Sequence, residues 1–367
     1  MKSWVFWVCI TVAAYFIYSS WFAPHEADGE TAVSLTLQET DPPTKEAEPV
    51  DPESEPTRLN VEAEKKPPPP GPGGDPAAKL LRERDDRAVE GKTDAARQVE
   101  ERILEEHSRS RAALAVLLDR GETSYRRFKN VGRNLDGLAA AQKARQPLTR
   151  ALLLATGGER EGIREKLREL SDAVVFGGRH VTGADILYTP KRGDNLTTLC
   201  RKTFRKQGAY TAPGFVVSMN RMKSPRGLRA GEPIRIPVGR THLIIVKSEY
   251  RLYFLINETY VRDFPVGLGR EGLTPEASFV VADKMINPDW YPGSGAKIPH
   301  GHPDNILGTR WLGFKNTANL RGFGIHGTRD PASVGKDMSS GCIRMHQSDV
   351  EQIFDWTPYG ARVTIRR

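Results

Sequence analysis

The sequence predicts a multidomain protein with an N-terminal transmembrane helix, a disordered linker, a helical region, a small βααβ unit and a mainly-β C-terminal domain. Three observations support this prediction. An uncharged apolar run opens the chain, and the composition then turns first to Pro, Glu, Asp and Thr and later to Ala, Leu, Glu and Arg. In the second half, short runs of β-branched and aromatic residues alternate with polar turns. The predicted segments are 1–22, 23–76, 77–176, 187–237 and 241–367.

The length and charge of the chain set broad limits. With 367 residues and 38% hydrophobic content, the chain has room for two or three domains with real cores. Its formal charge of +8 suggests attraction to anionic surfaces. An enzyme that acts on an anionic polymer outside the cell would show the same excess, so charge alone does not select a function. We expect no nucleic-acid partner, and the sequence leaves the oligomeric state open.

The N-terminal run predicts a membrane span. Residues 4–22, "WVFWVCITVAAYFIYSSWF", carry no charge and follow Lys2. Their number matches the ~20 residues that cross a bilayer core. A cleaved signal peptide usually has a shorter apolar region and small residues at the cut, whereas Trp21 and Phe22 are bulky. We therefore expect an uncleaved signal anchor. Lipid attachment at Cys9 is the alternative, but the "FWV" before it is not small.

Two segments of contrasting composition follow. Residues 23–76 contain few large apolar side chains, so burial cannot offset their ordering entropy. We expect a disordered tether, stiffened into polyproline II at Pro67 to Pro70. Residues 77–176 predict a helical region with breaks at Gly121 and at Gly157-Gly158. This region carries no visible chemistry, and we interpret it as a spacer or a partner-binding module.

A compact βααβ unit is predicted between residues 187 and 237. A short strand is followed by a turn in which Asp194 can cap the next helix, then by a second apolar helix at Phe215 to Met219 and by a closing strand "EPIRIP". Cys200 falls on the first helix, where we expect a buried apolar role. Because no linker separates Pro237 from the next strand, a further hypothesis is that this unit docks on the following domain and restricts entry to it.

The order and spacing of these elements resemble the LysM domain. The departure is between Thr203 and Gly214, where the chain is longer and more basic than is usual. The resemblance implies binding of glycans that contain N-acetylglucosamine, in bacteria chiefly peptidoglycan. The alternative is a βααβ packing module without a sugar site. The matching residues are Tyr188, Gly193, Asp194, Leu196, Asn220, Leu228, Gly231 and Ile234-Arg235-Ile236-Pro237.

A cysteine near the C-terminus is the candidate nucleophile. Cys342 stands in "SSGCIRM", and His326 in "GFGIHGT" precedes it by sixteen positions. A free thiol is only a few per cent ionised at neutral pH, so a cysteine nucleophile needs a base beside it. If these stretches form neighbouring strands, alternation places His326 and Cys342 on one face and Ile325 and Ile343 on the other. The alternative is a small, buried, inert cysteine.

The neighbours of Cys342 suit this chemistry. Gly341 allows a tight turn in which consecutive N–H groups, including that of Cys342, converge on an oxyanion. Arg344 shares the face of Cys342 and can hold a substrate carboxylate with two parallel hydrogen bonds. A structural ion pair is the alternative role for Arg344.

The tract "IHGT…SVGKDMSSGCIRMHQSDV" resembles the active-site signature of the L,D-transpeptidases with a YkuD-type domain, and the likeness extends over residues 241–367. It implies a mainly-β catalytic domain in which Cys342 is the nucleophile, His326 the base and Gly327 the residue whose carbonyl orients the imidazole. It also implies that Ser339, Ser340, Gly341 and Arg344 bind substrate. Two positions depart from the family pattern: Ser340 stands where histidine is common, and Ala277 where glycine is usual.

The resemblance implies acyl transfer on peptidoglycan stem tetrapeptides. The thiolate attacks the L-centre carbonyl of a diamino acid at the third position, D-alanine leaves, and an amine then displaces the enzyme to give a 3→3 cross-link. No cofactor or metal is expected. The expected location is the periplasm or extracytoplasmic wall space, in a single-pass membrane protein.

Other functions remain open at this stage. A non-catalytic wall protein that binds peptidoglycan is one, although it predicts loss of Cys342 or His326. A sortase-like cysteine transpeptidase is another, although the "TL.TC" tract of that group is missing. A metal-dependent site could use His300, His302 and Asp304 in "PHGHPD", but no further ligand is indicated.

Overall fold

The computed structural model describes residues 75–181, 183–204, 211–292 and 295–367. The predicted signal anchor at 1–22 and almost all of the predicted linker at 23–76 lie outside these residues. Within the described ranges, no helix is both long enough and apolar enough to cross a membrane.

The helical region predicted for residues 77–176 is present. The break predicted at Gly157-Gly158 is confirmed, because one helix ends at Leu154 and the next begins at Glu159. The break at Gly121 is wrong. A side-chain carbon added there would lie 2.5 Å from the Leu148 side chain, so this glycine allows two helices to approach closely rather than ending one. The helices are α2 (Pro76–Val89), α3 (Thr93–Glu106), α4 (Arg111–Val131), α5 (Leu135–Leu154) and α6 (Glu159–Val174).

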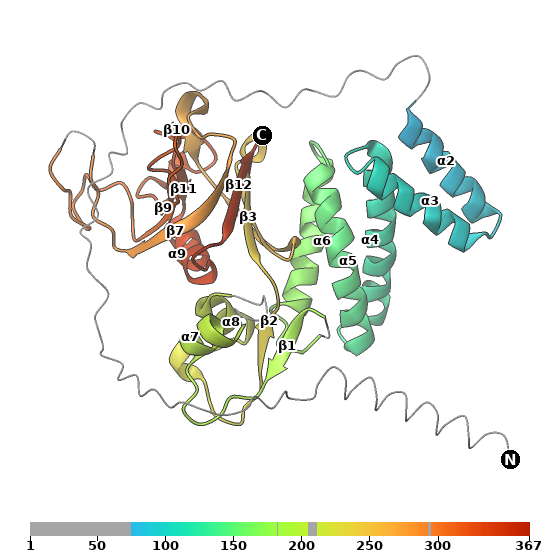
Figure 1. The fold of residues 1–367 in the computed structure, drawn as a ribbon, viewed down its shortest axis with the longest axis horizontal. Helices are drawn as coiled ribbons and strands as arrows, with labels where there is room; N and C mark the ends of the chain where they lie inside the picture. The colour runs from blue at the N-terminus through green and yellow to red at the C-terminus, as the bar shows by residue number, and fades with distance from the viewer. Residues whose placement is uncertain (1–74, 182, 205–210, 293–294) are drawn as a thin grey trace, which may run out of the picture. The chain divides into compact units, whose positions relative to one another are not determined.

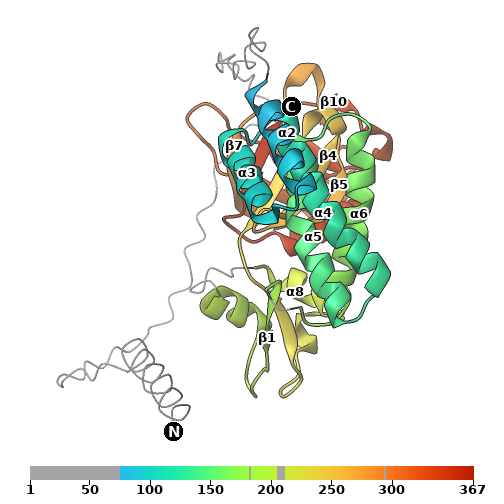
Figure 2. The same cartoon turned by 90° about the vertical axis from the view of Figure 1, so that its right-hand side faces the viewer.

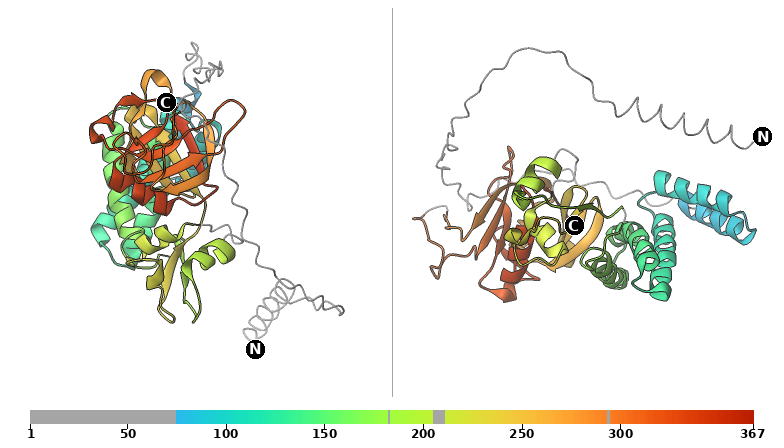
Figure 3. Two further views of the ribbon diagram at one scale, coloured as in Figure 1. Left: turned by 90° about the vertical axis from the view of Figure 1, so that its left-hand side faces the viewer. Right: turned by 90° about the horizontal axis from the view of Figure 1, so that it is seen from below.

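The next elements follow the predicted βααβ order (Figure 3). The first and last strands pair antiparallel, with Tyr188 opposite Ile234. Cys200 is buried as predicted, and burial raises the pKa of its thiol to about 12. The elements are β1 (Asp185–Tyr188), α7 (Leu196–Thr198), a π-helical turn (Leu199–Phe204), α8 (Pro213–Met219), a 3-10 turn (Pro225–Gly227) and β2 (Ile234–Pro237).

Side-chain hydrogen bonds hold this unit together. Asn220 ties α8 to β2, because its amide donates to the Arg235 carbonyl at 2.7 Å and its Oδ1 accepts from the Arg235 N–H at 2.7 Å. The helix cap predicted for Asp194 is wrong. Asn195 caps α7, while the Asp194 carboxylate accepts from the Tyr188 hydroxyl at 2.8 Å and from the Lys191 N–H at 2.7 Å.

The C-terminal part forms one mixed sheet of eight strands in the order β11-β9-β8-β7-β12-β3-β4-β5 (Figure 1). The pairs β11–β9 and β12–β3 are parallel, and the other pairs of this sheet are antiparallel. A separate short ladder joins β10 to β6 in parallel. The elements are β3 (Thr241–Val246), β4 (Arg251–Ile256), β5 (Thr259–Pro265), β6 (Leu268–Gly269), β7 (Ser278–Ile286), β8 (Arg310–Phe314), β9 (Gly324–Gly327), β10 (Asp337–Ser339), β11 (Ile343–Met345), α9 (Gln347–Trp356), β12 (Arg362–Arg366), and 3-10 turns at Lys247–Glu249, Arg270–Gly272 and Pro331–Ser333.

The two faces of this sheet bury different partners. In β3, Leu243 and Ile245 join a core with Ile353 of α9, and we call this side the α9 face. Ile244 and Val246 join the core of the helical region instead. We call this second side the site face. Strand alternation thus gives the sheet a separate apolar layer on each side.

The helical region also covers the edge of the sheet. β5 is an edge strand, and Tyr260 in it has both backbone groups bound by helices: its N–H donates to Thr149 Oγ1 at 2.9 Å, and its carbonyl accepts from Arg145 Nη2 at 2.6 Å. Helices α5 and α6 contact β5, and Figure 2 shows the helical region in front of the sheet. An uncovered edge is a template for pairing with other chains, so these helices protect the sheet as well as packing on it.

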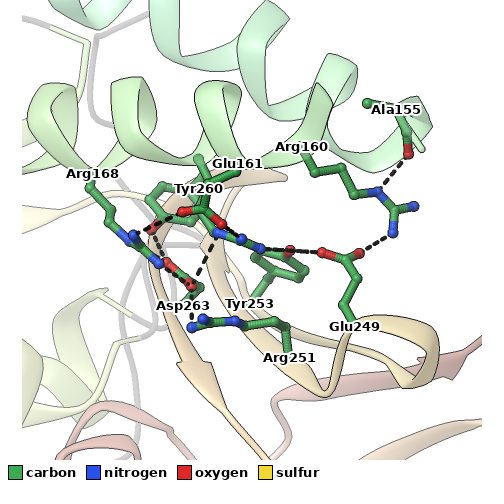
Figure 4. Close-up of polar contacts among 10 residues, drawn as sticks. Ala155, Arg160, Glu161, Arg168, Glu249, Arg251, Tyr253, Tyr260 and Asp263 are labelled. Carbon is green, nitrogen blue, oxygen red and sulfur yellow. Dashed lines mark hydrogen bonds and ion pairs between the residues drawn. The ribbon is translucent and has the colours of Figure 1, made fainter. Parts of the chain in front are cut away.

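A buried carboxylate binds α6 to the sheet (Figure 4). Asp263 of β5 accepts from Arg168 Nη2 at 2.8 Å, from Arg251 Nη1 at 2.9 Å and from the Tyr260 hydroxyl at 2.5 Å. Burial alone would raise the pKa of Asp263, but the hydrogen bonds from Arg168 and Tyr260 outweigh it and the pKa lies below its usual value. Nearby, Glu249 accepts from Arg160 of α6 and from the Tyr253 hydroxyl.

The βααβ unit packs on the α9 side. Phe215 of α8 meets Trp356 of α9 edge to face at 5.2 Å between ring centroids, and the Trp356 indole N–H donates to Ser218 Oγ at 2.9 Å. A side-chain carbon added at Gly214 would lie 2.5 Å from the Asp355 carbonyl oxygen, so α8 and α9 are in close backbone contact.

Replacing Asp263 tests the helix–sheet interface. We expect Asp263→Ala to lower the free energy of unfolding by about 3 kcal/mol, because it leaves Arg168 and Arg251 without their shared carboxylate. The measurement is urea unfolding of the full-length chain. Because the pKa of Asp263 is lowered by folding, its contribution is present above pH about 4 and is lost as the pH falls through the native value.

Asp172→Ala is the matched control, because the ion pair of Asp172 with Arg262 is partly exposed at 2.7 Å. Its effect should stay below about 1 kcal/mol. Equal losses in the two variants would contradict a stabilising role for the buried cluster.

Candidate active site

The two strands that carry the sequence motif are neighbours in the sheet. β9 and β11 run parallel, with Ile325 opposite Ile343 and His326 opposite Arg344. Both isoleucines are fully buried on the α9 face. By alternation, His326 and Arg344 therefore share the site face, and Cys342 lies in the turn directly before β11.

A set of hydrogen bonds fixes the turn before Cys342. Ser339 is buried, and its Oγ donates to the Cys342 carbonyl at 2.6 Å and accepts from the Gly341 N–H at 3.1 Å. Gly341 has φ of 127°, a value that favours glycine. The Thr274 hydroxyl donates to the Gly341 carbonyl at 2.9 Å and accepts from the Gly269 N–H at 2.7 Å. The Ser339 hydroxyl thus shapes the turn, although the sequence assigned it to substrate binding.

The backbone N–H groups differ from the expected pattern. Gly341 donates its N–H to Ser339, so this group is not free to meet an oxyanion. Among the described residues, the Cys342 N–H has no hydrogen-bond partner. The Gly341 N–H is therefore not one of the converging groups that were expected, while Cys342 keeps an available donor. Ser340 is exposed at the surface of the turn.

The imidazole of His326 is buried and oriented by backbone carbonyls. Its Nδ1 lies 2.6 Å from the Gly327 carbonyl oxygen, the hydrogen bond that the sequence predicted for Gly327. Burial lowers the pKa of His326 to about 4, against the opposite effect of the Gly327 and Ile306 carbonyls. At neutral pH the ring is neutral and can accept a proton. Trp311 of β8 pairs with His326 in the ladder, and their rings lie 6.1 Å apart.

The thiol of Cys342 is partly exposed and neutral in this state. Burial raises its pKa to about 11, while the Gly324 backbone and the Arg344 charge act in the opposite direction. Its Sγ lies 3.6 Å from the Gly322 carbonyl oxygen. Among the described residues, no hydrogen bond joins Sγ to His326. Catalytic hydrogen bonds of this kind commonly tighten only when substrate binds.

Arg344 presents a half-buried guanidinium. No described residue forms a salt bridge with it, and its Nε has no hydrogen-bond partner within the described ranges. Burial lowers the pKa of Arg344, and the charge of Asp330 acts against this shift. The structural ion pair considered as its alternative role is therefore not formed, and the guanidinium is available to an anion.

Sequence reasoning missed several residues that build this site. Thr274 and Gly269 brace the turn from a loop far away along the chain. Gln347 opens α9 and accepts from Thr309 at 3.2 Å, and a side-chain carbon added at Gly327 would lie 2.2 Å from its Oε1. In the sequence, these residues stand out only because they lie close to the motifs. Their contacts depend on the register of the folded sheet.

The residues of the metal alternative bond within their own loop. His302 Nδ1 accepts from the Asp304 N–H at 3.2 Å, and the His300 N–H donates to Asp289 Oδ1 at 3.0 Å. Among the described residues, no group of three or more His, Cys, Asp and Glu side chains is placed to hold a metal ion.

Comparison with known proteins identifies related sequences. Residues 240–365 match the YkuD family, described as the L,D-transpeptidase catalytic domain. The chain is 38% identical over 154 residues to YqjB of Bacillus subtilis strain 168, named as an L,D-transpeptidase, across 41% of this chain and 84% of that protein. It is 31% identical over 191 residues to YkuD of Bacillus licheniformis, also so named, across 49% of this chain and 98% of that protein.

Solved structures give a weaker match. L,D-transpeptidase 3 from Mycobacterium tuberculosis, in complex with a faropenem-derived adduct, aligns with a TM-score of 0.29 and 15% identity. The alignment covers 37% of this chain and 65% of that one. The chain thus spans less than two thirds of this solved protein.

The pKa of the thiol predicts slow alkylation at neutral pH. With a pKa of about 11, the thiolate fraction of Cys342 should rise about tenfold for each pH unit between 7 and 10. Iodoacetamide labelling of the full-length chain, resolved peptide by peptide, measures this rise. Cys200 is the internal control, since its burial keeps it unlabelled while the chain is folded. Rapid, pH-independent labelling of Cys342 would contradict a neutral resting thiol.

Because the Thr274 hydroxyl holds the turn before Cys342 by two hydrogen bonds, we expect its removal to lower activity without unfolding the chain. Thr274→Val removes both hydrogen bonds of the hydroxyl but keeps its shape, and should slow acylation of Cys342 by about tenfold or more through a misplaced turn. Thr274→Ser keeps the hydroxyl and should restore most of the rate. Acylation is followed by intact mass with a reactive β-lactam. Equal rates for both variants would show that the hydroxyl does not position Cys342.

Proposed function

The chain belongs to the L,D-transpeptidase family with a YkuD-type catalytic domain, and we propose that it forms 3→3 peptidoglycan cross-links through a thioester on Cys342. The observation that carries the proposal is the pairing of β9 with β11, which sets His326 opposite Arg344, while the turn of Cys342 leads directly into β11. The charge of Arg344 acts on both His326 and Cys342, so a nucleophile, a neutral base and a cation belong to one site. Acyl transfer from a carboxylate-bearing peptide needs these three groups.

The first half-reaction transfers the stem peptide to the enzyme. His326 is neutral, so it accepts the thiol proton as sulfur attacks the L-centre carbonyl of the diamino acid. The carbonyls of Gly327 and Ile306 then stabilise the imidazolium that forms. The C–N bond to D-alanine breaks, the imidazolium gives its proton to the leaving amine, and a thioester remains.

Two further groups support this step. We propose that the N–H of Cys342, which has no hydrogen-bond partner among the described residues, donates to the oxyanion of the tetrahedral intermediate, since it belongs to the nucleophile itself. Arg344 is the candidate partner for the terminal carboxylate of the donor stem, because its guanidinium has no salt bridge to a described residue. We propose that Ser340, which is exposed on the turn, contacts the bound stem peptide.

The second half-reaction releases the product. An amine attacks the thioester carbonyl, the C–N bond forms and the C–S bond breaks, which regenerates the thiol. A second stem peptide as acceptor gives the 3→3 cross-link. Other amine acceptors, a protein lysine or a free D-amino acid, would follow the same chemistry, and water would give hydrolysis.

We further propose that residues 187–237 are a LysM domain that binds the glycan. The bonds of Asp194 with Tyr188 and of Asn220 with Arg235 give a structural reason for those residues of the LysM pattern. Since α8 packs on α9, the unit approaches the catalytic sheet from the face opposite His326. We therefore propose that it orients the enzyme on the glycan and does not close the active site.

The N-terminal run supports a proposal on location. An apolar segment at residues 4–22 followed by a polar tether would hold the catalytic domain at the membrane while it reaches the wall. We propose a single-pass protein whose catalytic domain lies in the extracytoplasmic wall space.

Intact mass spectrometry of the full-length chain in detergent, mixed with a disaccharide tetrapeptide, tests the function. We expect a covalent adduct that has lost D-alanine. Cys342→Ala should form none, and His326→Gln should slow its formation by about 100-fold or more. Thr317→Ala, an exposed change outside the motif, should match the wild type. A folded wild-type chain without adduct or released D-alanine would contradict the enzyme and favour a wall-binding protein with a silent catalytic domain.

A further inference from the structure

An aromatic wall borders the catalytic pair on the β7–β8 side. Trp311 pairs with His326, and Gly313 pairs with Gly324. A side-chain carbon added at Gly324 would lie 2.6 Å from Trp311 Cη2, and one added at Gly313 would lie 2.7 Å from Trp311 Nε1. The indole therefore extends across both glycines, with its benzene edge at Gly324 and its N–H edge at Gly313. Because neither glycine has a side chain, the ring can lie directly over both residues.

A carboxylate stands at the far edge of the indole. Asp283 of β7 pairs with Gly313, and the same added carbon at Gly313 would lie 3.1 Å from Asp283 Cβ. Asp283 is exposed, and its carboxylate has no hydrogen bond or ion pair with a described residue. Met285, opposite Trp311, is 40% exposed on the same face. This strip of the site face is therefore open to a ligand.

The charges on the two sides of His326 are opposite. Arg344 lies on the β11 side, where the proposed function places the donor carboxylate. Asp283 and the indole lie on the β8–β7 side. A carboxylate beside an aromatic face attracts an organic ammonium group, by ion pairing and by the cation–π interaction. A donor that presents a carboxylate and an acceptor that presents an ammonium group would therefore bind on opposite sides of the thiol.

We propose that Asp283 and Trp311 form the acceptor subsite, which binds the ammonium group of an incoming primary amine next to the thioester on Cys342. The inference rests on the proposed function and deepens it, because it specifies how the enzyme selects an amine over water. Trp311 supplies the surface along which the amine side chain reaches His326. Asp283 does not touch the reacting carbonyl and acts by raising the local concentration of the amine.

At this subsite, aminolysis of the thioester begins from the ammonium form of the acceptor. The bound ammonium releases one proton to solvent and becomes an amine. Its nitrogen attacks the thioester carbonyl, the C–N bond forms and the C–S bond breaks. The second proton of the nitrogen passes to His326 and from there to the departing thiolate. One ammonium and one thioester give one amide, one thiol and one released proton.

The partition between amide product and hydrolysed product measures use of the acceptor in a single sample. The full-length chain in detergent receives a disaccharide tetrapeptide donor whose own side-chain amine is acetylated, together with a stem tripeptide that carries a free amine. Mass spectrometry gives the ratio of amide product to hydrolysed product. For Asp283→Asn we expect this ratio to fall by about fivefold or more and the KM for the acceptor to rise by a similar factor. Asp283→Glu should recover most of the ratio.

A matched control and the salt dependence separate binding from general damage. Asp94→Asn makes the same change of charge on an exposed site of α3 and should keep the wild-type ratio. Added salt should lower the ratio in the wild type but much less in Asp283→Asn, because screening weakens the same ion pair.

The outcomes separate this subsite from the proposed function. If the wild type releases D-alanine but Asp283→Asn keeps the wild-type ratio, the acceptor subsite is wrong and the function stands. If Asp283→Asn slows D-alanine release as much as amide formation, Asp283 serves the donor and the subsite is again wrong. A wild type that releases no D-alanine overturns the function, and the subsite with it.

Discussion

The register between β9 and β11 is the constraint on which the site depends. It places Arg344 opposite His326 and sets the position of Cys342, the residue directly before β11. Because strand side chains alternate, a slip of one residue would turn Cys342 toward the α9 core and expose Ile343 instead. Burial of Ile325 and Ile343 opposes that slip, and the bonds of Ser339 across the turn add a second, polar restraint. Buried apolar side chains that face away from the site thus fix the positions of the catalytic residues.

The sheet also organises the rest of the molecule, because each face receives a different part of the chain. Helices α5 and α6 cover the site face over β3 to β5 and bond to the edge strand through Arg145 and Asp263. Helices α9 and α8 lie on the other face, joined through Trp356. The helical region is therefore built into the fold of the catalytic sheet, which its composition alone did not indicate.

The sequence predicted the parts of the site that follow from local periodicity or a contiguous motif. Strand alternation predicted one face for His326 and Arg344, whereas the carbonyl of Gly327 at the imidazole was implied by the resemblance to the L,D-transpeptidases. Strand alternation could not identify Thr274, whose bond to Gly341 spans 67 positions. The cap expected at Asp194 failed because the Tyr188 hydroxyl and Lys191 N–H bind that carboxylate, and Asn195 takes the helix instead. The signal anchor and the tether remain predictions from composition.

The docking of the helical region has a consequence for how the protein is made. Arg145 meets a strand 115 positions later, and the Leu153 carbonyl accepts from Arg366, 213 positions later, at 3.0 Å. The ribosome therefore delivers the helices well before the strands that complete their packing. Their apolar faces stay uncovered until β3 to β5 and β12 have been made, because these strands follow the helices in the chain. The helical region is therefore exposed to aggregation during synthesis until the strands that cover it have been made.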